Sequence, residues 1–155
     1  MLKAKDIMAR EIITISPEAK TLDAARILLD RRINGLPVVD ADGRLVGILC
    51  QSDLVAQQKR LSLPSFFNLL DGLIPLASTK TWEQEIQRIG ANIVAQAMTA
   101  DPVTVSPDTS LEEIASLMVD RKLHTLPVVE NGKLVGVVGK EDILRTLLNL
   151  DAVSR

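Results

Sequence analysis

The chain has 155 residues and a formal net charge of −2, with 46% hydrophobic but only 2% aromatic residues. This length fits one domain, or two very small ones that share a core. The balanced charge and the scarcity of aromatic side chains argue against nucleic-acid binding, which uses basic surfaces and base stacking. The single cysteine, Cys50, excludes an internal disulfide and fits a reducing compartment. No apolar run reaches the ~20 residues of a membrane span, and no signal-peptide pattern is present, so we expect a cytoplasmic protein.

Two copies of one pattern run through the sequence, about 90 residues apart. The segments that return are Leu36–Val39 as Leu126–Val129, Arg44–Gly47 as Lys133–Gly136, and Asp53 as Asp142. Two copies of a repeat of this size predict a pseudo-symmetric pair of small units. Such a pair creates clefts between its halves, where ligands commonly bind.

In chain order, the first copy predicts a β-α-β-β-α unit. Residues 11–15 predict a short strand that ends at Ser16-Pro17. A helix is predicted over 21–32, and its apolar face is expected to hold Leu22, Ala25, Leu28 and Leu29. Two strands follow, joined at Asp42-Gly43, because such a pair supplies the positive φ angles of hairpin turns. The final helix is predicted to begin near Ser52.

Residues 60–91 belong to neither copy and contain all three aromatic side chains of the chain. We expect two helices here, the first ended by Pro75 and the second starting at Trp82. One interpretation is a helical hairpin that packs on its own chain. The alternative is a contact for a second copy or a partner, since exposed apolar patches mark interfaces.

The second copy repeats the unit, with a helix predicted over 110–122. Its apolar side is expected to hold Leu111, Ile114, Ala115 and Met118, and Ser110 with Glu113 predicts a capping box. After the turn at Asn131-Gly132, the last helix begins near Lys140 and is expected to direct Ile143, Leu144, Leu147 and Leu148 toward a core. The predicted fold is therefore α/β (α+β), divided into repeat 1 (1–60), a helical insert (61–91) and repeat 2 (92–155).

Groups that common catalytic and metal sites need are missing. His124 is the only histidine, Cys50 has no second cysteine with which to bind zinc, and no phosphate-binding loop or dinucleotide fingerprint occurs. We therefore predict no catalytic residues, no metal site and no enzymatic activity. Cys50 is interpreted as a small buried apolar side chain, with a redox-sensitive thiol as the alternative.

What recurs is a corner where a strand ends and a helix opens with Asp53 or Asp142. A carboxylate there can accept hydrogen bonds from two neighbouring hydroxyls, such as a ribose diol. The helix N-terminus adds N–H groups and partial positive charge for a phosphate. The alternative is that each aspartate only stabilises the first turn of its helix.

Each copy resembles a cystathionine-β-synthase (CBS) domain, and the pair resembles a Bateman module. The motifs that carry this resemblance are Asp6–Met8 and Gln96–Thr99, Ile33–Val39 and His124–Val129, and the corners Gly47 to Asp53 and Gly136 to Asp142. The resemblance implies a pseudo-two-fold pair that dimerises, binds adenosine-containing ligands in its clefts and regulates other proteins without catalysing a reaction.

Carried over to this sequence, the resemblance implies that Asp53 and Asp142 bind ribose. Adenine would lie against Thr14-Ile15 and Thr104-Val105, with apolar walls from Leu36-Pro37-Val38 and Leu126-Pro127-Val128. Where the family often has Thr or Ser, this chain has Cys50 and Gly139, so each site loses a hydrogen bond of ~0.5–1.5 kcal/mol. Gly139 in turn allows a phosphate to approach closely, and Lys140 supplies a cation. His124 either lines the cleft or is an ordinary, partly exposed side chain.

The resulting hypothesis is a regulatory module that senses AMP, ADP or ATP and acts on an unidentified protein. A homodimer is expected through the last helices, which carry Leu144, Leu147, Leu148 and Leu150. The alternative is a scaffold that binds no ligand and contacts a partner through the central insert.

Overall fold

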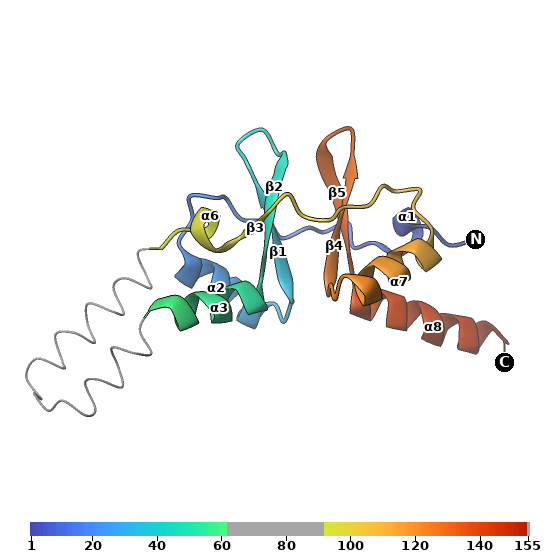
Figure 1. The fold of residues 1–155 in the computed structure, drawn as a ribbon. Helices are drawn as coiled ribbons and strands as arrows, with labels where there is room; N and C mark the ends of the chain where they lie inside the picture. The colour runs from blue at the N-terminus through green and yellow to red at the C-terminus, as the bar shows by residue number, and fades with distance from the viewer. Residues whose placement is uncertain (62–91, 155) are drawn as a thin grey trace, which may run out of the picture.

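The computed structural model describes residues 1–61 and 92–154, which form two similar α+β halves (Figure 1). The first half contains α2 (Thr21–Asp30), β1 (Gly35–Val39), β2 (Leu45–Cys50) and α3 (Gln51–Leu61). The second contains α7 (Leu111–Asp120), β4 (Thr125–Glu130), β5 (Lys133–Gly139) and α8 (Lys140–Ser154). The predicted pair of pseudo-symmetric repeats is confirmed. The prediction of two helices between residues 60 and 91 lies outside the described residues.

Each half is built on an antiparallel hairpin whose register is the same in both copies. Leu36 pairs with Leu49 in the first hairpin, and Leu126 pairs with Val138 in the second. A short strand, β3 (Thr99–Ala100), adds to the free edge of β2. In the view of Figure 1 the hairpin tips point upward, and the four long helices lie below them.

The predicted strand over 11–15 is reduced to a single parallel bridge between Ile15 and Val38, and Val105 bridges Val128 in the same way. Ile15 accepts a hydrogen bond from the N–H of Val39 at 3.0 Å. Pairing stops there because the chain turns at Ser16-Pro17 on one side and leaves the sheet on the other.

The two halves exchange their leading segments. Helix α1 (Ala4–Ile7) packs in the core of the second half, and α6 (Val94–Ala97) packs in the core of the first. The N–H of Ala4 donates to the carbonyl of Thr109 and that of Val94 to the carbonyl of Ala19, both at 2.8 Å. Each core is thus completed by residues that precede the other repeat, and the chain must cross between the halves twice.

The long helices differ from prediction in which faces they bury. Helix α2 buries Thr21, Ala24 and Leu28, while Leu29 is 73% exposed, so the predicted face that included Leu22 and Leu29 was wrong. Spacing at i, i+3 and i+7 defines the buried stripe, and the neighbouring leucines fall outside it. In α7, Ile114 and Met118 are buried as predicted. Only half of the predicted capping box is seen, since Ser110 accepts a hydrogen bond from the N–H of Glu113 at 3.2 Å.

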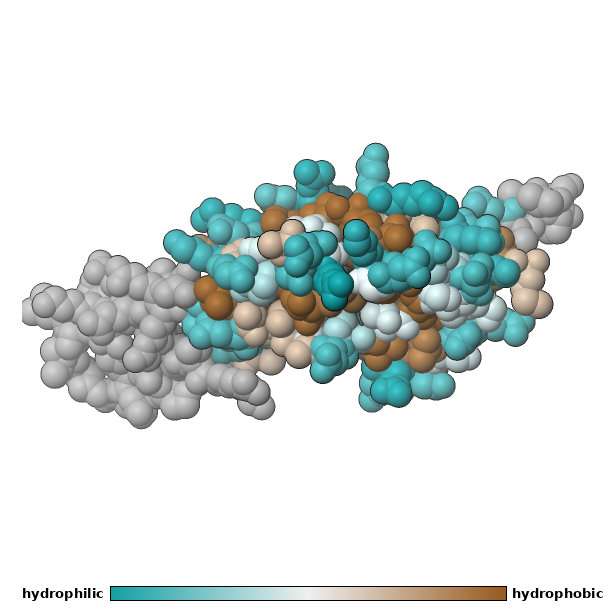
Figure 2. Space-filling view, turned by 90° about the horizontal axis from the view of Figure 1, so that it is seen from above, coloured by the Kyte–Doolittle hydropathy of each residue, from teal (hydrophilic) through white to brown (hydrophobic). Residues whose placement is uncertain are grey.

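Helix α8 packs Ile143 against the second core, as predicted, but it does not direct Leu144, Leu147 and Leu148 there, which corrects the rest of that prediction. Leu144, Leu147 and Leu148 are 59%, 55% and 69% exposed. Helix α8 contacts β5, α7 and α1, and its Thr146 is buried. The opposite face of the molecule, seen from the hairpin tips, is largely hydrophilic with separate hydrophobic patches (Figure 2).

Candidate functional site

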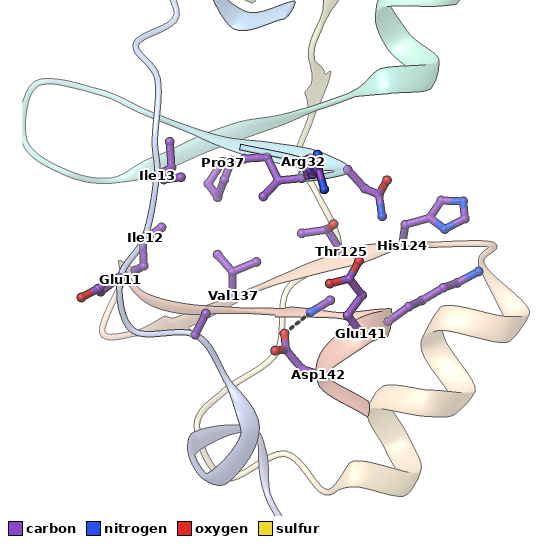
Figure 3. A pocket seen from close by; sticks show the side chains of 16 residues that line it. Glu11, Ile12, Ile13, Arg32, Pro37, His124, Thr125, Val137, Glu141 and Asp142 are labelled. Atoms are coloured by element: carbon purple, nitrogen blue, oxygen red, sulfur yellow. Dashed lines mark hydrogen bonds between the residues drawn. The ribbon is translucent and has the colours of Figure 1, made fainter. Parts of the chain in front are cut away.

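A cleft of about 200 Å³ lies where the two halves meet. Four parts of the chain line it: the crossing segment that follows α1, the end of α2 with the start of β1, the start of β4, and the corner between β5 and α8 (Figure 3). The lining residues are Ala9, Glu11–Ile13, Arg32–Gly35, Pro37, His124, Thr125, Val137 and Gly139–Asp142. The site therefore exists because the crossing segment passes between the two hairpins.

Asp142 provides the carboxylate of this cleft from the first turn of α8. One of its oxygens, Oδ2, accepts a hydrogen bond from the N–H of Gly139 at 2.8 Å. The other, Oδ1, lies 3.6 Å from Nη1 of Arg145, a side chain that is itself 69% exposed. An exposed ion pair contributes ~0–1 kcal/mol, so a ligand hydroxyl can replace Arg145 at little cost. Asp142 thus both caps its helix and offers an acceptor to the cleft.

The cleft combines apolar and cationic groups around that carboxylate. Ile12, Ile13, Pro37 and Val137 form its apolar lining (Figure 3). Arg32 and Lys140 contribute cations to the lining, Glu11 and Glu141 contribute further carboxylates, and His124 lines the cleft as well. The apolar lining is complementary to a flat ring, the carboxylate to a diol, and the cations to an anionic group.

The corresponding corner of the first half holds Asp53. Its Oδ2 accepts a hydrogen bond from the N–H of Cys50 at 2.8 Å, which reproduces the contact of Asp142 with Gly139. Its Oδ1 lies 3.4 Å from the hydroxyl of Thr99, which donates to it. The two predicted corners therefore share one geometry but differ in what surrounds the second carboxylate oxygen.

Cys50 is a neutral thiol in this structure. Burial raises its pKa from the ordinary 9.0 to about 11, and the negative charge of Asp53 acts in the same direction. A thiol without thiolate character is a poor nucleophile, which favours the small-apolar interpretation over a redox sensor.

Of the predicted site residues, Pro37, His124, Gly139, Lys140 and Asp142 line the cleft together. Cys50 and Asp53 lie in the other corner. Of the predicted apolar walls only Pro37 lines the cleft, and the side chains of Leu36, Val38, Leu126 and Val128 are fully buried in the two cores. Pro127 is likewise fully buried and is not among the lining residues.

The predicted adenine segments also lie beside the cleft and not in it. Thr14 is exposed, Ile15 is buried, and the crossing segment lines the cleft one to three residues earlier, at Glu11–Ile13. Thr104 and Val105 occupy the equivalent positions of the second half, exposed and buried respectively. That these segments bind adenine stays a prediction. Arg32 and Asn34, which were not among the predicted site residues, line the cleft because the halves meet at the end of α2.

Among residues 1–61 and 92–154, no three His, Cys, Asp or Glu side chains gather as a metal-ligand set. Within the same part of the chain, no helix is long and apolar enough to cross a membrane.

Curated relatives match this chain over nine-tenths or more of its length. The chain is 30% identical to the uncharacterized protein MJ1426 of Methanocaldococcus jannaschii, covering 93% of this chain and 90% of that protein. It is 28% identical to the chloroplastic CBS domain-containing protein CBSX1 of Arabidopsis thaliana, where 90% of this chain matches 61% of the relative. It also matches an inosine-5'-monophosphate dehydrogenase of Korarchaeum cryptofilum at 29% identity, covering 91% of this chain but only 23% of that enzyme.

Solved structures share the fold. The crystal structure of CBSX2 in complex with AMP has a TM-score of 0.73 at 26% identity, covering 96% of this chain and 98% of that one. The CBS domain pair of protein MJ0100, in complex with 5-methylthioadenosine and S-adenosyl-L-methionine, has a TM-score of 0.72 at 25% identity, with the same coverage. The family model for the CBS domain matches residues 4–59 and 94–149. The chain therefore belongs to the CBS domain family and carries two CBS domains in tandem.

Proposed function

We propose that this protein is a regulatory module that binds an adenosine-containing nucleotide in the cleft at Asp142. The observation that carries the proposal is the position of Asp142, whose Oδ1 borders a cleft lined by apolar side chains and cations. Relatives of the same fold were solved with AMP and with S-adenosyl-L-methionine, which supports an adenosine-containing ligand. The match to a quarter or less of a larger enzyme supports a role as a regulatory part, separate from catalysis.

In this proposal the parts of the nucleotide occupy different sides of the cleft. Adenine contacts the apolar surface formed by Ile12, Ile13 and Pro37, which suits a flat ring. The ribose hydroxyls donate to Asp142, and the phosphate lies near the N-terminus of α8 and Lys140. Because the cleft is small, further phosphates extend toward solvent, so AMP, ADP and ATP share the same contacts to adenosine.

Calorimetric titration with AMP, ADP, ATP, NAD and S-adenosylmethionine tests this function. We expect binding of at least one of these ligands to the wild-type protein and a loss of affinity in Asp142→Ala. If none of the five binds, the sensing role is refuted and the scaffold hypothesis takes its place.

A second proposal concerns assembly, and the exposed leucines of α8 support it. A largely apolar hollow beside them is lined by Ala115, Met118, Val119, Ile143 and Leu144, with three basic side chains at its border. Exposed apolar surface of this kind commonly marks a protein interface. We propose that α7 and α8 pair with those of a second copy, so that nucleotide binding at the start of α8 can influence the dimer. Sedimentation equilibrium at micromolar concentration tests it, and a strictly monomeric mass contradicts it.

A further inference from the structure

Three of the differences between the two pseudo-symmetric corners make the Asp53 corner less open. Ala9 corresponds to Thr99, since Ala9 bridges Val137 while Thr99 pairs with Ile48 at the equivalent place. The other two differences stand at the start of the last helix of each half: Gly139 against Cys50, and Lys140 against Gln51.

Thr99 places a hydroxyl on the carboxylate oxygen that a ligand would need. Its Oγ1 lies 3.4 Å from Oδ1 of Asp53, while Oδ2 is occupied by the N–H of Cys50. Thr99 belongs to β3, whose backbone pairs with β2, and this pairing keeps the residue next to the carboxylate. At the other corner Ala9 has no hydroxyl, and the group near Oδ1 is the 69% exposed side chain of Arg145, which also donates to Glu141 at 3.5 Å.

Cys50 fills space that is empty at Gly139. A Cβ added at Gly139 would meet nothing closer than Oδ2 of Asp142 at 3.7 Å and the carbonyl oxygen of His124 at 3.8 Å. The thiol of Cys50 reaches within 3.5 Å of the Cβ position of Gly35, where the two halves meet. Cys50 therefore lacks the bare backbone that Gly139 offers to a phosphate.

Gln51 replaces the cation of Lys140, and its side chain is already used. Its Nε2 donates to the carbonyl oxygen of Ile33 at 3.1 Å. Asp53 also borders a separate cavity, whose other lining residues are Ala56, Gln57, Asn92, Gln96, Ala97 and Met98. No lysine, arginine or histidine is among them, and the cavity shares no residue with the Asp142 cleft.

We propose that the chain binds one nucleotide and not two: the Asp142 cleft is the site, and Thr99, Cys50 and Gln51 close the Asp53 corner. This inference rests on the proposed function, since it concerns the number of sites for the same ligand. Asp53 is then a structural residue that caps α3, although it is the sequence counterpart of a ligand-binding residue.

The test is the stoichiometry of AMP binding, measured by calorimetry with a known concentration of active chain. Wild-type protein is expected to bind one AMP per chain. Asp53→Ala is expected to keep that stoichiometry and affinity, while Asp142→Ala is expected to lose at least ten-fold in affinity. Two AMP per chain in the wild type, or loss of binding in Asp53→Ala alone, overturns the inference while the proposed function stands. No binding at all overturns both.

Two exchange variants test the three closing residues directly. Thr99→Ala with Cys50→Gly and Gln51→Lys is expected to raise the stoichiometry from one to two. The reciprocal variant, Ala9→Thr with Gly139→Cys and Lys140→Gln, is expected to abolish binding, and the open space at Gly139 allows its cysteine to be accommodated. A folded first variant that still binds one AMP, or a reciprocal variant that binds as the wild type does, shows that these residues do not close the corner.

Discussion

Replacing Asp142 by alanine separates the two roles that the structure gives this carboxylate. Removing Oδ2 leaves the N–H of Gly139 without its partner at 2.8 Å, and removing the negative charge weakens the first turn of α8. The lost hydrogen bond costs ~0.5–1.5 kcal/mol. The lost interaction with the helix dipole costs ~0.3–1 kcal/mol. A total of ~1–2 kcal/mol lowers the melting temperature by roughly 2–8 °C for a chain of this size.

The effect on binding is separate and larger if Asp142 accepts hydrogen bonds from ribose. Hydrogen bonds to a charged group contribute ~1.5–3 kcal/mol, which corresponds to a loss of about ten-fold or more in affinity for AMP. Asp53→Ala is the matched control, because it removes the same capping bond, from the N–H of Cys50 at 2.8 Å. The melting temperatures of both variants should fall by similar amounts, but only Asp142→Ala should lose affinity for AMP.

Differential scanning fluorimetry and calorimetric titration, made on the same samples, provide the two readouts. If Asp142→Ala melts earlier yet binds AMP as the wild type does, the carboxylate only caps its helix and the proposed ribose contact is refuted. An equal loss of affinity in both variants would instead mean that capping, and not ribose contact, controls the cleft.

Three further predictions concern other parts of the molecule. Lys140→Ala should lower the affinity for ATP by about two- to five-fold more than the affinity for adenosine, as expected for a largely exposed ion pair. Equal losses of affinity for both ligands in calorimetry would show that Lys140 does not contact the phosphate. Leu148→Asp should shift a wild-type dimer toward monomer in sedimentation equilibrium, because it puts a charge into the exposed apolar face of α8; an unchanged mass would place the interface elsewhere. The pKa of Cys50, raised by burial from 9.0 to about 11, means that folding keeps the thiol protonated while the unfolded chain loses its proton. The contribution of this thiol to stability should therefore be full below pH 9 and decline between about pH 9 and pH 11, and Cys50→Ala should not show that decline in urea titrations; identical pH profiles would contradict it.

Much of the fold could be predicted because its signals are local. The turn at Asn131-Gly132 has positive φ at both residues, 53° and 79°, as its sequence indicates. The first turn was less regular: only Gly43 has a positive φ, and the carboxylate of Asp40 accepts the N–H groups of Asp42 and Arg44 at 2.9 Å. The repeated corners could also be predicted, because the end of a strand, a short bend and an aspartate in the first turn of a helix follow one another in the chain.

Packing between distant segments could not be read in the same way. Nothing near Ala4 or Val94 indicates that α1 completes the second core and α6 the first, since this exchange depends on how the chain crosses between halves. Ile12 and Ile13 also line the cleft because of this crossing. They come one to three positions before Thr14-Ile15, the segment that the family resemblance implied for adenine. Leu28 is buried and Leu29 is not, because of how α2 is rotated about its axis against the hairpin. The helical spacing of apolar residues does not determine which of two adjacent leucines faces the core.

The most direct test of the nucleotide site is to locate AMP on the protein by amide chemical shifts. In a titration of the uniformly labelled wild-type chain, the N–H signals of Gly139, Lys140, Asp142 and Ile13 should move and saturate together. The signals of Cys50 and Asp53, in the equivalent corner, should remain in place. Movement confined to Cys50 and Asp53, or no movement in either corner at millimolar AMP, would contradict a nucleotide site at Asp142.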